Sequence, residues 1–151
     1  MNNDGNNDLE LTVDKFTFRF PRQLQYSEAG LWIRREGSRI RVGLSDFAQQ
    51  RNGDIAFANL NPPGTVLEAN DEIATIETVK VNMSLPSPVK GTIVEVNAAL
   101  AEAAELINQD PYGTGWMAVV EPDPNRPLAG LLDVESYRDL ARQQAEAELK
   151  S

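Results

Sequence analysis

Short runs of apolar and β-branched residues, each ended by a turn, fill most of this chain, and their spacing strongly constrains its fold. Apolar residues at 31–33 and 40–44 flank the turn Glu36-Gly37-Ser38 and predict a β-hairpin. Runs of this length are typical of strands, and the Pro and Gly residues between them end each strand. Further strands are expected at 55–60, 72–79, 92–96 and 116–120, and we expect Trp116 of the last strand to be in the core. The fold class predicted is therefore mainly β with short helices.

The two ends of the chain differ from this pattern. Residues 1–10 begin with a polar stretch without periodicity, so we expect a disordered N-terminus, followed by a single strand over 11–20. The tail 131–151 has Val134, Tyr137, Leu140 and Ala141 on one face, which predicts a helix packed on a β-domain of residues 11–130. We expect its end to fray beyond Arg142, where that face thins. Shorter helices are expected at 46–51 and 98–108.

Composition excludes several classes of function. The 151 residues contain no His and no Cys, which removes thiolate nucleophiles, zinc fingers, His-based acid–base catalysis and disulfides. A net charge of −9 argues against nucleic-acid and anionic-membrane partners, which need a basic patch. No apolar run approaches the roughly 18 residues of a membrane-spanning helix, and no signal peptide is recognisable. We expect a cytoplasmic, monomeric, non-catalytic protein without a metal.

A short segment is repeated. Residues 64–70 (GTVLEAN) and 91–97 (GTIVEVN) match at Gly, Thr, Glu and Asn, with apolar residues between them. A repeat at about the length of one supersecondary unit predicts a β-domain built from two similar halves. Lys80 lies between the two copies, at the expected tip of a hairpin. A hairpin tip holds a lysine away from the body of a protein, where a modifying enzyme can reach its ε-amine. By itself, however, E-x-x-K is also common around ordinary surface lysines.

Four segments together resemble the H protein of the glycine cleavage system. The segment 42–55 (VGLSDFAQQRNGDI) is similar to that family's V-G-I-T-x-x-A-Q-x-x-x-G-D-I, and Glu77-Thr78-Val79-Lys80 to its E-S-V-K. The segments 87–97 and 108–116 resemble S-P-x-x-G-x-V-x-x-V-N and N-x-D-P-Y-G-x-G-W. The order and spacing agree, and the resemblance extends over about 26–137.

The resemblance implies a fold, a cofactor and a set of site residues. The fold is a flattened β-barrel, the barrel-sandwich hybrid of lipoyl domains, with a C-terminal helix. Lipoate would be amide-linked to Lys80, with Glu77 recognised by the attaching enzyme and Thr78, Val79 and Val81 beside the arm. The arm carries the chemistry, so the chain needs no nucleophile of its own. The implied partners are a lipoate ligase or lipoyl transferase and dihydrolipoamide dehydrogenase.

Departures from the family pattern leave the pathway open. Gly30 and Leu31 replace a His-Glu pair, Asn59 replaces a glutamate, and residues 81–84 differ from the small and acidic residues that usually follow the lysine. Because the family places these positions around the arm, they favour a lipoate-binding paralogue serving a heterodisulfide-reductase-like complex in sulfur oxidation. The alternative is a glycine-cleavage carrier that serves glycine decarboxylase and aminomethyltransferase. A second class is an interaction module whose Lys80 is never modified.

Overall fold

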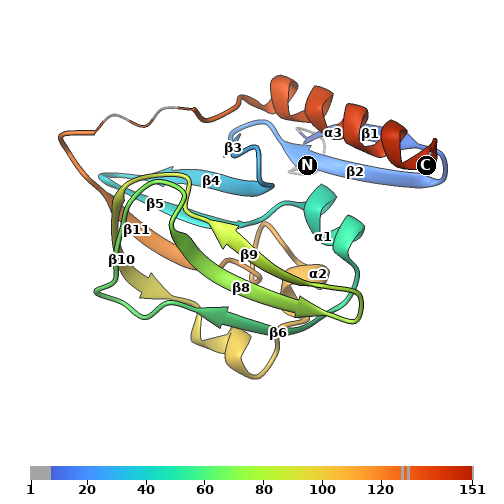
Figure 1. Cartoon of the computed structure of the whole chain (residues 1–151). Helices are drawn as coiled ribbons and strands as arrows, with labels where there is room; N and C mark the ends of the chain where they lie inside the picture. The colour runs from blue at the N-terminus through green and yellow to red at the C-terminus, as the bar shows by residue number, and fades with distance from the viewer. Residues whose placement is uncertain (1–7, 127, 129, 151) are drawn as a thin grey trace, which may run out of the picture.

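The computed structural model describes residues 8–126, 128 and 130–150. It confirms a mainly β chain with short helices and one long C-terminal helix (Figure 1). The strands are β1 (Asp8–Val13), β2 (Phe16–Pro21), β3 (Gln25–Tyr26), β4 (Leu31–Glu36), β5 (Arg39–Leu44), β6 (Ile55–Leu60), β7 (Val66–Leu67), β8 (Glu72–Thr78), β9 (Asn82–Pro86), β10 (Gly91–Val96) and β11 (Ala118–Pro122). The helices are α1 (Asp46–Asn52), the 3₁₀ helix η2 (Ala98–Ala101), α2 (Leu106–Gln109) and α3 (Val134–Leu149).

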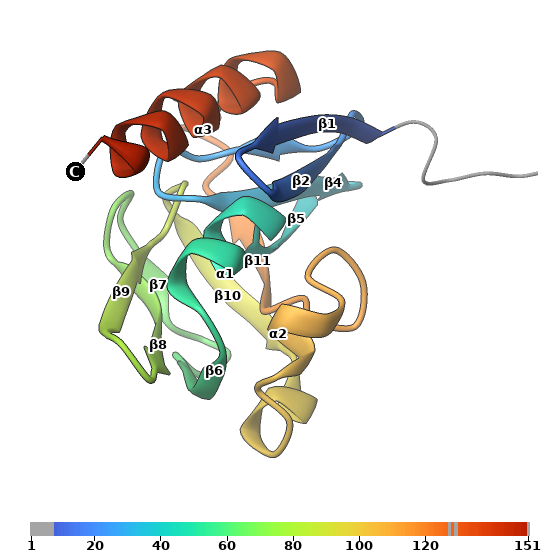
Figure 2. The same ribbon diagram turned by 90° about the vertical axis from the view of Figure 1, so that its right-hand side faces the viewer.

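Two sheets enclose the main core. One has six strands in the order β3-β4-β5-β11-β10-β7, and the other has three in the order β6-β8-β9. Ile33 and Val42 of the larger sheet are buried in the same cluster as Ile76 and Leu85 of the smaller sheet. Because residues alternate between the faces of a strand, each sheet contributes one apolar face to this core. The third sheet is the hairpin β1-β2, which lies apart, beside α3 (Figure 2).

The expected hairpin at 31–44 is confirmed as β4 and β5, and its interior explains one glycine of the sequence. Trp32 is 0% exposed and lies opposite Gly43, and its Nε1 donates a hydrogen bond to the Pro111 carbonyl at 2.8 Å. A Cβ at Gly43 would lie 2.6 Å from the indole ring, so only glycine fits there. Trp116, which we expected in the core, is only partly buried, with the Arg41 guanidinium 4.3 Å from its ring centroid. The core tryptophan is therefore Trp32.

The N-terminal expectations are wrong in two places. Residues 8–10 are not disordered but begin β1, and the single strand expected over 11–20 is a hairpin whose turn has Asp14 at φ 58°. Leu9 and Leu11, opposite Phe20 and Phe18, are buried in the hairpin cluster. A single strand could not bury all these residues, so the fold turns back at Asp14. The expectation for residues 1–7 lies outside the described residues.

The two other helix expectations need correction as well. The helix expected over 98–108 divides into η2, which begins after the cap Asn97, whose side chain accepts a hydrogen bond from the Ala99 amide, and α2, which begins only at Leu106. Helix α3 begins after the cap Asp133 and continues to Leu149 instead of fraying beyond Arg142. Its later turns are held because Ala145 is buried and Arg51 binds Glu148. None of the helices among the described residues is both long and apolar enough to cross a membrane.

The repeated segments pair with each other across the larger sheet. Strands β7 and β10 are antiparallel, with Leu67 opposite Gly91 and Val66 opposite Thr92. The Ile93 amide donates to the Thr65 carbonyl at 2.9 Å. The second residue of each copy thus faces the third residue of the other, which is the arrangement that a local two-fold axis produces. The hairpin β8-β9 lies in the chain between the copies and carries the lysine at its tip.

Candidate functional site

The turn between β8 and β9 is ordered by the side chain of Thr78. Its Oγ1 accepts hydrogen bonds from the amides of Lys80 at 3.1 Å and Val81 at 3.0 Å, and it donates to the Val81 carbonyl at 3.1 Å. The Thr78 amide also donates to the Val81 carbonyl at 2.8 Å. A hydroxyl at this position satisfies turn amides that would otherwise depend on water. The sequence expectation placed Thr78 beside the arm, and its structural role is to fix the backbone of the lysine.

The side chains at this tip face solvent. Lys80 is exposed, and its neighbours Val79 and Val81 are among the exposed large hydrophobic residues, with Val79 90% exposed. Deeper in the hairpin, Ile76 and Leu85 are fully buried and anchor it to the core. An anchored hairpin that ends in an exposed lysine between two valines presents one amine on a rigid support. Apolar side chains in water have no packing reason to be there, which is consistent with a surface that another protein contacts.

Glu77 lies on β8 next to this turn. It pairs in register with Asn82 on β9 and with Phe57 on β6. The amide Nδ2 of Asn59 donates to its carboxylate at 3.4 Å. A glutamate at position 59 would place a second carboxylate beside that of Glu77. Asn59 is uncharged and donates a hydrogen bond to Glu77 instead.

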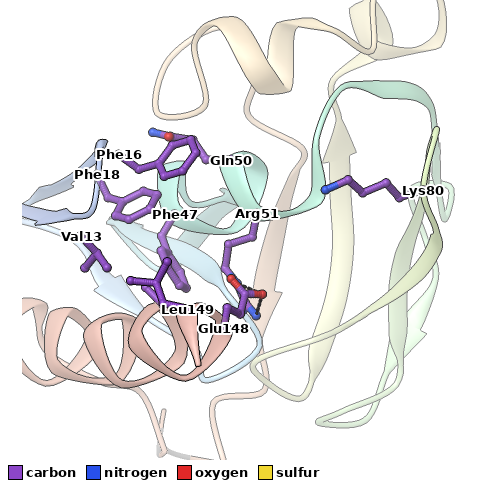
Figure 3. Close-up of a pocket in the computed structure, with 10 residues that line it drawn as sticks. Val13, Phe16, Phe18, Phe47, Gln50, Arg51, Lys80, Glu148 and Leu149 are labelled. Atoms are coloured by element: carbon purple, nitrogen blue, oxygen red, sulfur yellow. Dashed lines mark hydrogen bonds and ion pairs between the residues drawn. The ribbon is translucent and has the colours of Figure 1, made fainter. Parts of the chain in front are cut away.

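A pocket of about 230 Å³ lies on the side of the turn toward which Lys80 points, and Lys80 lines it (Figure 3). Its walls come from the hairpin β1-β2, helix α1 and the last turns of α3. The large apolar side chains that line it are Val13, Phe16, Phe18, Phe47 and Leu149. The rings of Phe18 and Phe47 meet edge to face with centroids 4.9 Å apart.

An ion pair closes the polar side of this pocket. Arg51 Nη2 lies 2.6 Å from Glu148 Oε2, and Arg51 Nη1 donates to Gln144 at 3.0 Å. The guanidinium also lies 5.2 Å from the ring centroid of Phe47. The hydrogen bond from Arg51 lowers the pKa of Glu148 below its ordinary value, and the charge of Lys80 acts in the same direction. The pair therefore stays ionised at neutral pH and connects α1 to the end of α3.

The structure changes the interpretation of the departures at Gly30 and Leu31. Leu31 is fully buried in the main core, so its side chain does not face an arm on Lys80. Gly30 has φ 103°, and a Cβ there would lie 2.9 Å from Ala48 Cβ, so the backbone itself selects glycine. Gly30 lines a second pocket of about 150 Å³, which shares Arg51 and Glu148 with the first. These two departures are thus accounted for by packing and backbone conformation.

Sequence reasoning missed the apolar pocket. It treated Phe16 and Phe18 as residues of one strand, and it assigned no role to Phe47 or Leu149. The sequence pattern that could have indicated it is the alternation of phenylalanines at 16, 18 and 20 before a proline. Alternation alone, however, does not show whether that face of the strand is covered by the core or lines a pocket. No group of three or more potential metal-ligating side chains occurs among the described residues.

Comparison with known proteins gives a consistent result. The model of the family "Glycine cleavage H-protein" matches residues 24–144. The glycine cleavage system H protein of Chlorobium limicola is 46% identical over 122 residues, covering 80% of this chain and 95% of that protein. The H protein of Geobacillus thermodenitrificans is 42% identical over 117 residues, covering 78% and 92%. A crystal structure of the Mycobacterium marinum H protein superposes with a TM-score of 0.73 at 30% identity, covering 80% of this chain and 97% of that one.

Proposed function

Since this chain belongs to the glycine cleavage H-protein family, we propose that it carries a lipoyl group on Lys80 and serves a glycine cleavage system. Members of this family are non-catalytic carrier subunits with lipoate bound covalently to a lysine. The chain matches these two relatives over 92% and 95% of their lengths.

The presentation of Lys80 supports this assignment more than any other observation. A modifying enzyme must reach the ε-amine and form an amide with an activated lipoyl carboxyl; the activating group leaves, two of the three protons of the ε-ammonium are released, and one stays on the amide nitrogen. Lys80 is exposed at the tip of an anchored hairpin, and Thr78 holds the amides of Lys80 and Val81 in one turn. The exposed amine of Lys80 is therefore placed to receive a lipoyl group without any rearrangement of the main chain.

The chain's own residues provide attachment and presentation. A lipoyl group supplies a cyclic disulfide that accepts a substrate group or electrons by thiol–disulfide exchange. Lys80 tethers it, Thr78 orders the tether's base, and Glu77 with the exposed valines offers the recognition surface for the ligase or transferase. Tethering raises the local concentration of the carried group to the order of millimolar, as for any short flexible link.

The relatives favour the glycine-cleavage pathway over sulfur oxidation. The relatives of this chain are described as glycine cleavage system H proteins. They give no support to the heterodisulfide-reductase-like partner that we inferred from the departures from the family motifs. Burial of Leu31 also removes one of the reasons for preferring that paralogue. The partners we propose are glycine decarboxylase, aminomethyltransferase, dihydrolipoamide dehydrogenase and the lipoyl-attaching enzyme. Glycine–bicarbonate exchange with a glycine decarboxylase tests the pathway, and a lipoylated carrier that supports no exchange would contradict it.

Intact mass tests the attachment site and separates the carrier from an unmodified interaction module. The chain is co-expressed with a lipoate ligase as wild type, Lys80→Arg and Lys90→Arg. Lys90 is the matched control because its Nζ pairs with Glu68 at 3.2 Å, away from the turn. We expect one added lipoyl group on the wild type and on K90R, and none on K80R. Addition to K80R would overturn the site, and an unmodified wild type would favour the interaction module.

A further inference from the structure

We propose that a pocket at the end of the molecule opposite Lys80 binds the diphosphate group of a small molecule. This arginine pocket is lined by Arg35, Arg39 and Arg126 and lies between the β4-β5 turn and the segment that follows β11. In Figure 1 these two segments lie at one end of the molecule, and the β8-β9 turn lies at the other. The site does not depend on lipoylation, and a ligand bound there leaves the lysine accessible.

The first argument is a local concentration of positive charge. The chain has a net charge of −9, yet residues 34–41 (RREGSRIR) contain four of its 14 basic residues and a single acidic residue. Arg126 lines the same pocket as Arg35 and Arg39 of this segment. At physiological salt the Debye length is about 8 Å, so exposed acidic residues elsewhere on the chain are largely screened. The charges of the pocket wall therefore decide which ion binds there.

The carboxylates that line the arginine pocket are already paired. Glu121 Oε1 lies 3.4 Å from Arg39 Nε. One carboxylate oxygen of Asp123 accepts a hydrogen bond from the Asn125 amide at 2.8 Å, and the other lies 4.0 Å from Lys90 Nζ. Each acidic residue of the wall is thus offset by a cation, so neither neutralises the remaining guanidinium groups of the pocket.

Two guanidinium groups remain without a counter-charge, those of Arg35 and Arg126. Arg35 Nε donates to the neutral side chain of Gln25 at 3.0 Å. Within residues 8–126, 128 and 130–150, no carboxylate forms an ion pair with Arg35 or Arg126. Guanidinium groups bind phosphate through paired N–H donors, and such charge-assisted hydrogen bonds are stronger than neutral ones. A phosphate group at each arginine would supply the missing negative charge.

Ordered turns hold both sides of the arginine pocket. Gly37 and Ser38 form the loop of the β4-β5 hairpin, and Gly37 has the positive φ of 66° that a tight hairpin loop uses. On the other side, the Arg126 amide donates to the Asp123 carbonyl at 3.1 Å and closes a turn with Pro124 in its second position. Proline is favoured at that position of common turns. Because the backbone on both sides is fixed before a ligand arrives, less entropy is lost on binding.

The size of the arginine pocket suits a diphosphate better than a single ion. Its volume is about 370 Å³, which lies at the lower end of the roughly 300–1,000 Å³ of small-molecule pockets. The two uncompensated arginines come from separate segments, so a ligand with two phosphate groups can contact both at once. Ile40, Pro122 and Leu128 add apolar wall, against which the organic part of a diphosphate ester can pack.

The test is a calorimetric titration of the full chain at about 0.15 M salt. The probes are inorganic phosphate, pyrophosphate and ADP. We expect saturable binding of pyrophosphate and ADP, and weaker binding of inorganic phosphate, because a single phosphate group contacts fewer donors. Arg35→Gln and Arg126→Gln should each weaken pyrophosphate binding about tenfold, through the loss of one charge-assisted contact. If neither pyrophosphate nor ADP bound saturably, the proposal would be overturned.

Arg142→Gln is the matched control. Arg142 lies on α3, pairs with Asp139 at 3.4 Å and does not line the arginine pocket, so the substitution removes the same charge elsewhere. This variant should bind pyrophosphate as the wild type does. Equal weakening by the control and by the pocket variants would show an effect of net charge alone and would contradict a specific site.

A second measurement does not depend on the variants. Pyrophosphate should shift the side-chain Nε–H resonances of Arg35 and Arg126 in the wild type and leave that of Arg142 unchanged. Saturable binding of poly-glutamate together with no binding of pyrophosphate or ADP would identify an acidic protein segment as the ligand and would also overturn the proposal. None of these results bears on the lipoylation of Lys80, which intact mass decides separately.

Discussion

Replacing Thr78 with valine tests whether the turn, rather than the mere exposure of the lysine, makes Lys80 a substrate for lipoylation. Valine keeps the β-branched shape and removes the hydroxyl, so the amides of Lys80 and Val81 lose their shared acceptor. A typical hydrogen bond contributes about 0.5–1.5 kcal/mol, and at an exposed turn water replaces part of both. We take about 1 kcal/mol for the loss of the ordered turn. Because 1.4 kcal/mol corresponds to a factor of ten, this predicts about a fivefold lower population of the competent turn.

The assay is the kcat/KM of a lipoate ligase on the unmodified protein, read by intact mass at early times. Thr78→Ser is the matched control, because it keeps the hydroxyl, and it should be modified at close to the wild-type rate. Urea unfolding should show Thr78→Val less stable than Thr78→Ser by no more than about 1 kcal/mol, the contribution taken for the turn, so both variants stay folded in the assay. If Thr78→Val were modified as fast as Thr78→Ser, the turn would not be what the enzyme recognises and the reasoning would be wrong.

Three further predictions concern packing and charge. Gly43→Ala should lower the free energy of unfolding by about 1–3 kcal/mol, because its Cβ would lie 2.6 Å from the Trp32 ring, and urea titration should show a smaller loss in a Trp32→Phe background. Leu31→Glu should cost at least about 3 kcal/mol in the same titration, because it removes a buried side chain and places a carboxylate in the core; a wild-type midpoint would contradict that burial. The pKa of Glu148 lies below its ordinary value of 4.5, so the pair with Arg51 stabilises the fold above that value and is lost as pH falls through the folded pKa. Hydrogen-exchange protection in the last turn of α3 should then fall below about pH 4.5 in the wild type but not in Glu148→Gln.

Local patterns predicted those elements whose cause is local. The hairpin around Gly37 follows from apolar runs on either side of a turn, and α1 follows from the Ser45 side chain, which accepts a hydrogen bond from the Ala48 amide. The lysine at the β8-β9 tip also follows from neighbouring residues, because Glu77-Thr78-Val79-Lys80 ends a predicted strand. These features depend on contacts within a few residues, so a single sequence contains the information.

The tertiary structure decided what local spacing leaves open. The stretch Leu11–Phe20 alternates well enough for one strand, but the apolar residues can be buried against α3 only if the chain turns at Asp14. Likewise, Trp32 rather than Trp116 occupies the core because β4 lies inside the larger sheet and Gly43 leaves room for its ring.

The attachment lysine and the apolar pocket show the same division. A carrier family and one candidate lysine can be predicted from the amino-acid sequence, since both depend on contiguous motifs. The pocket beside that lysine needs Phe16 from the first hairpin, Phe47 from α1 and Leu149 from the last turn of the chain. Residues so far apart meet only after the strands have paired and α3 has packed on the hairpin. The physical reason is that a pocket is a property of side chains brought together by the core, and no local pattern encodes it.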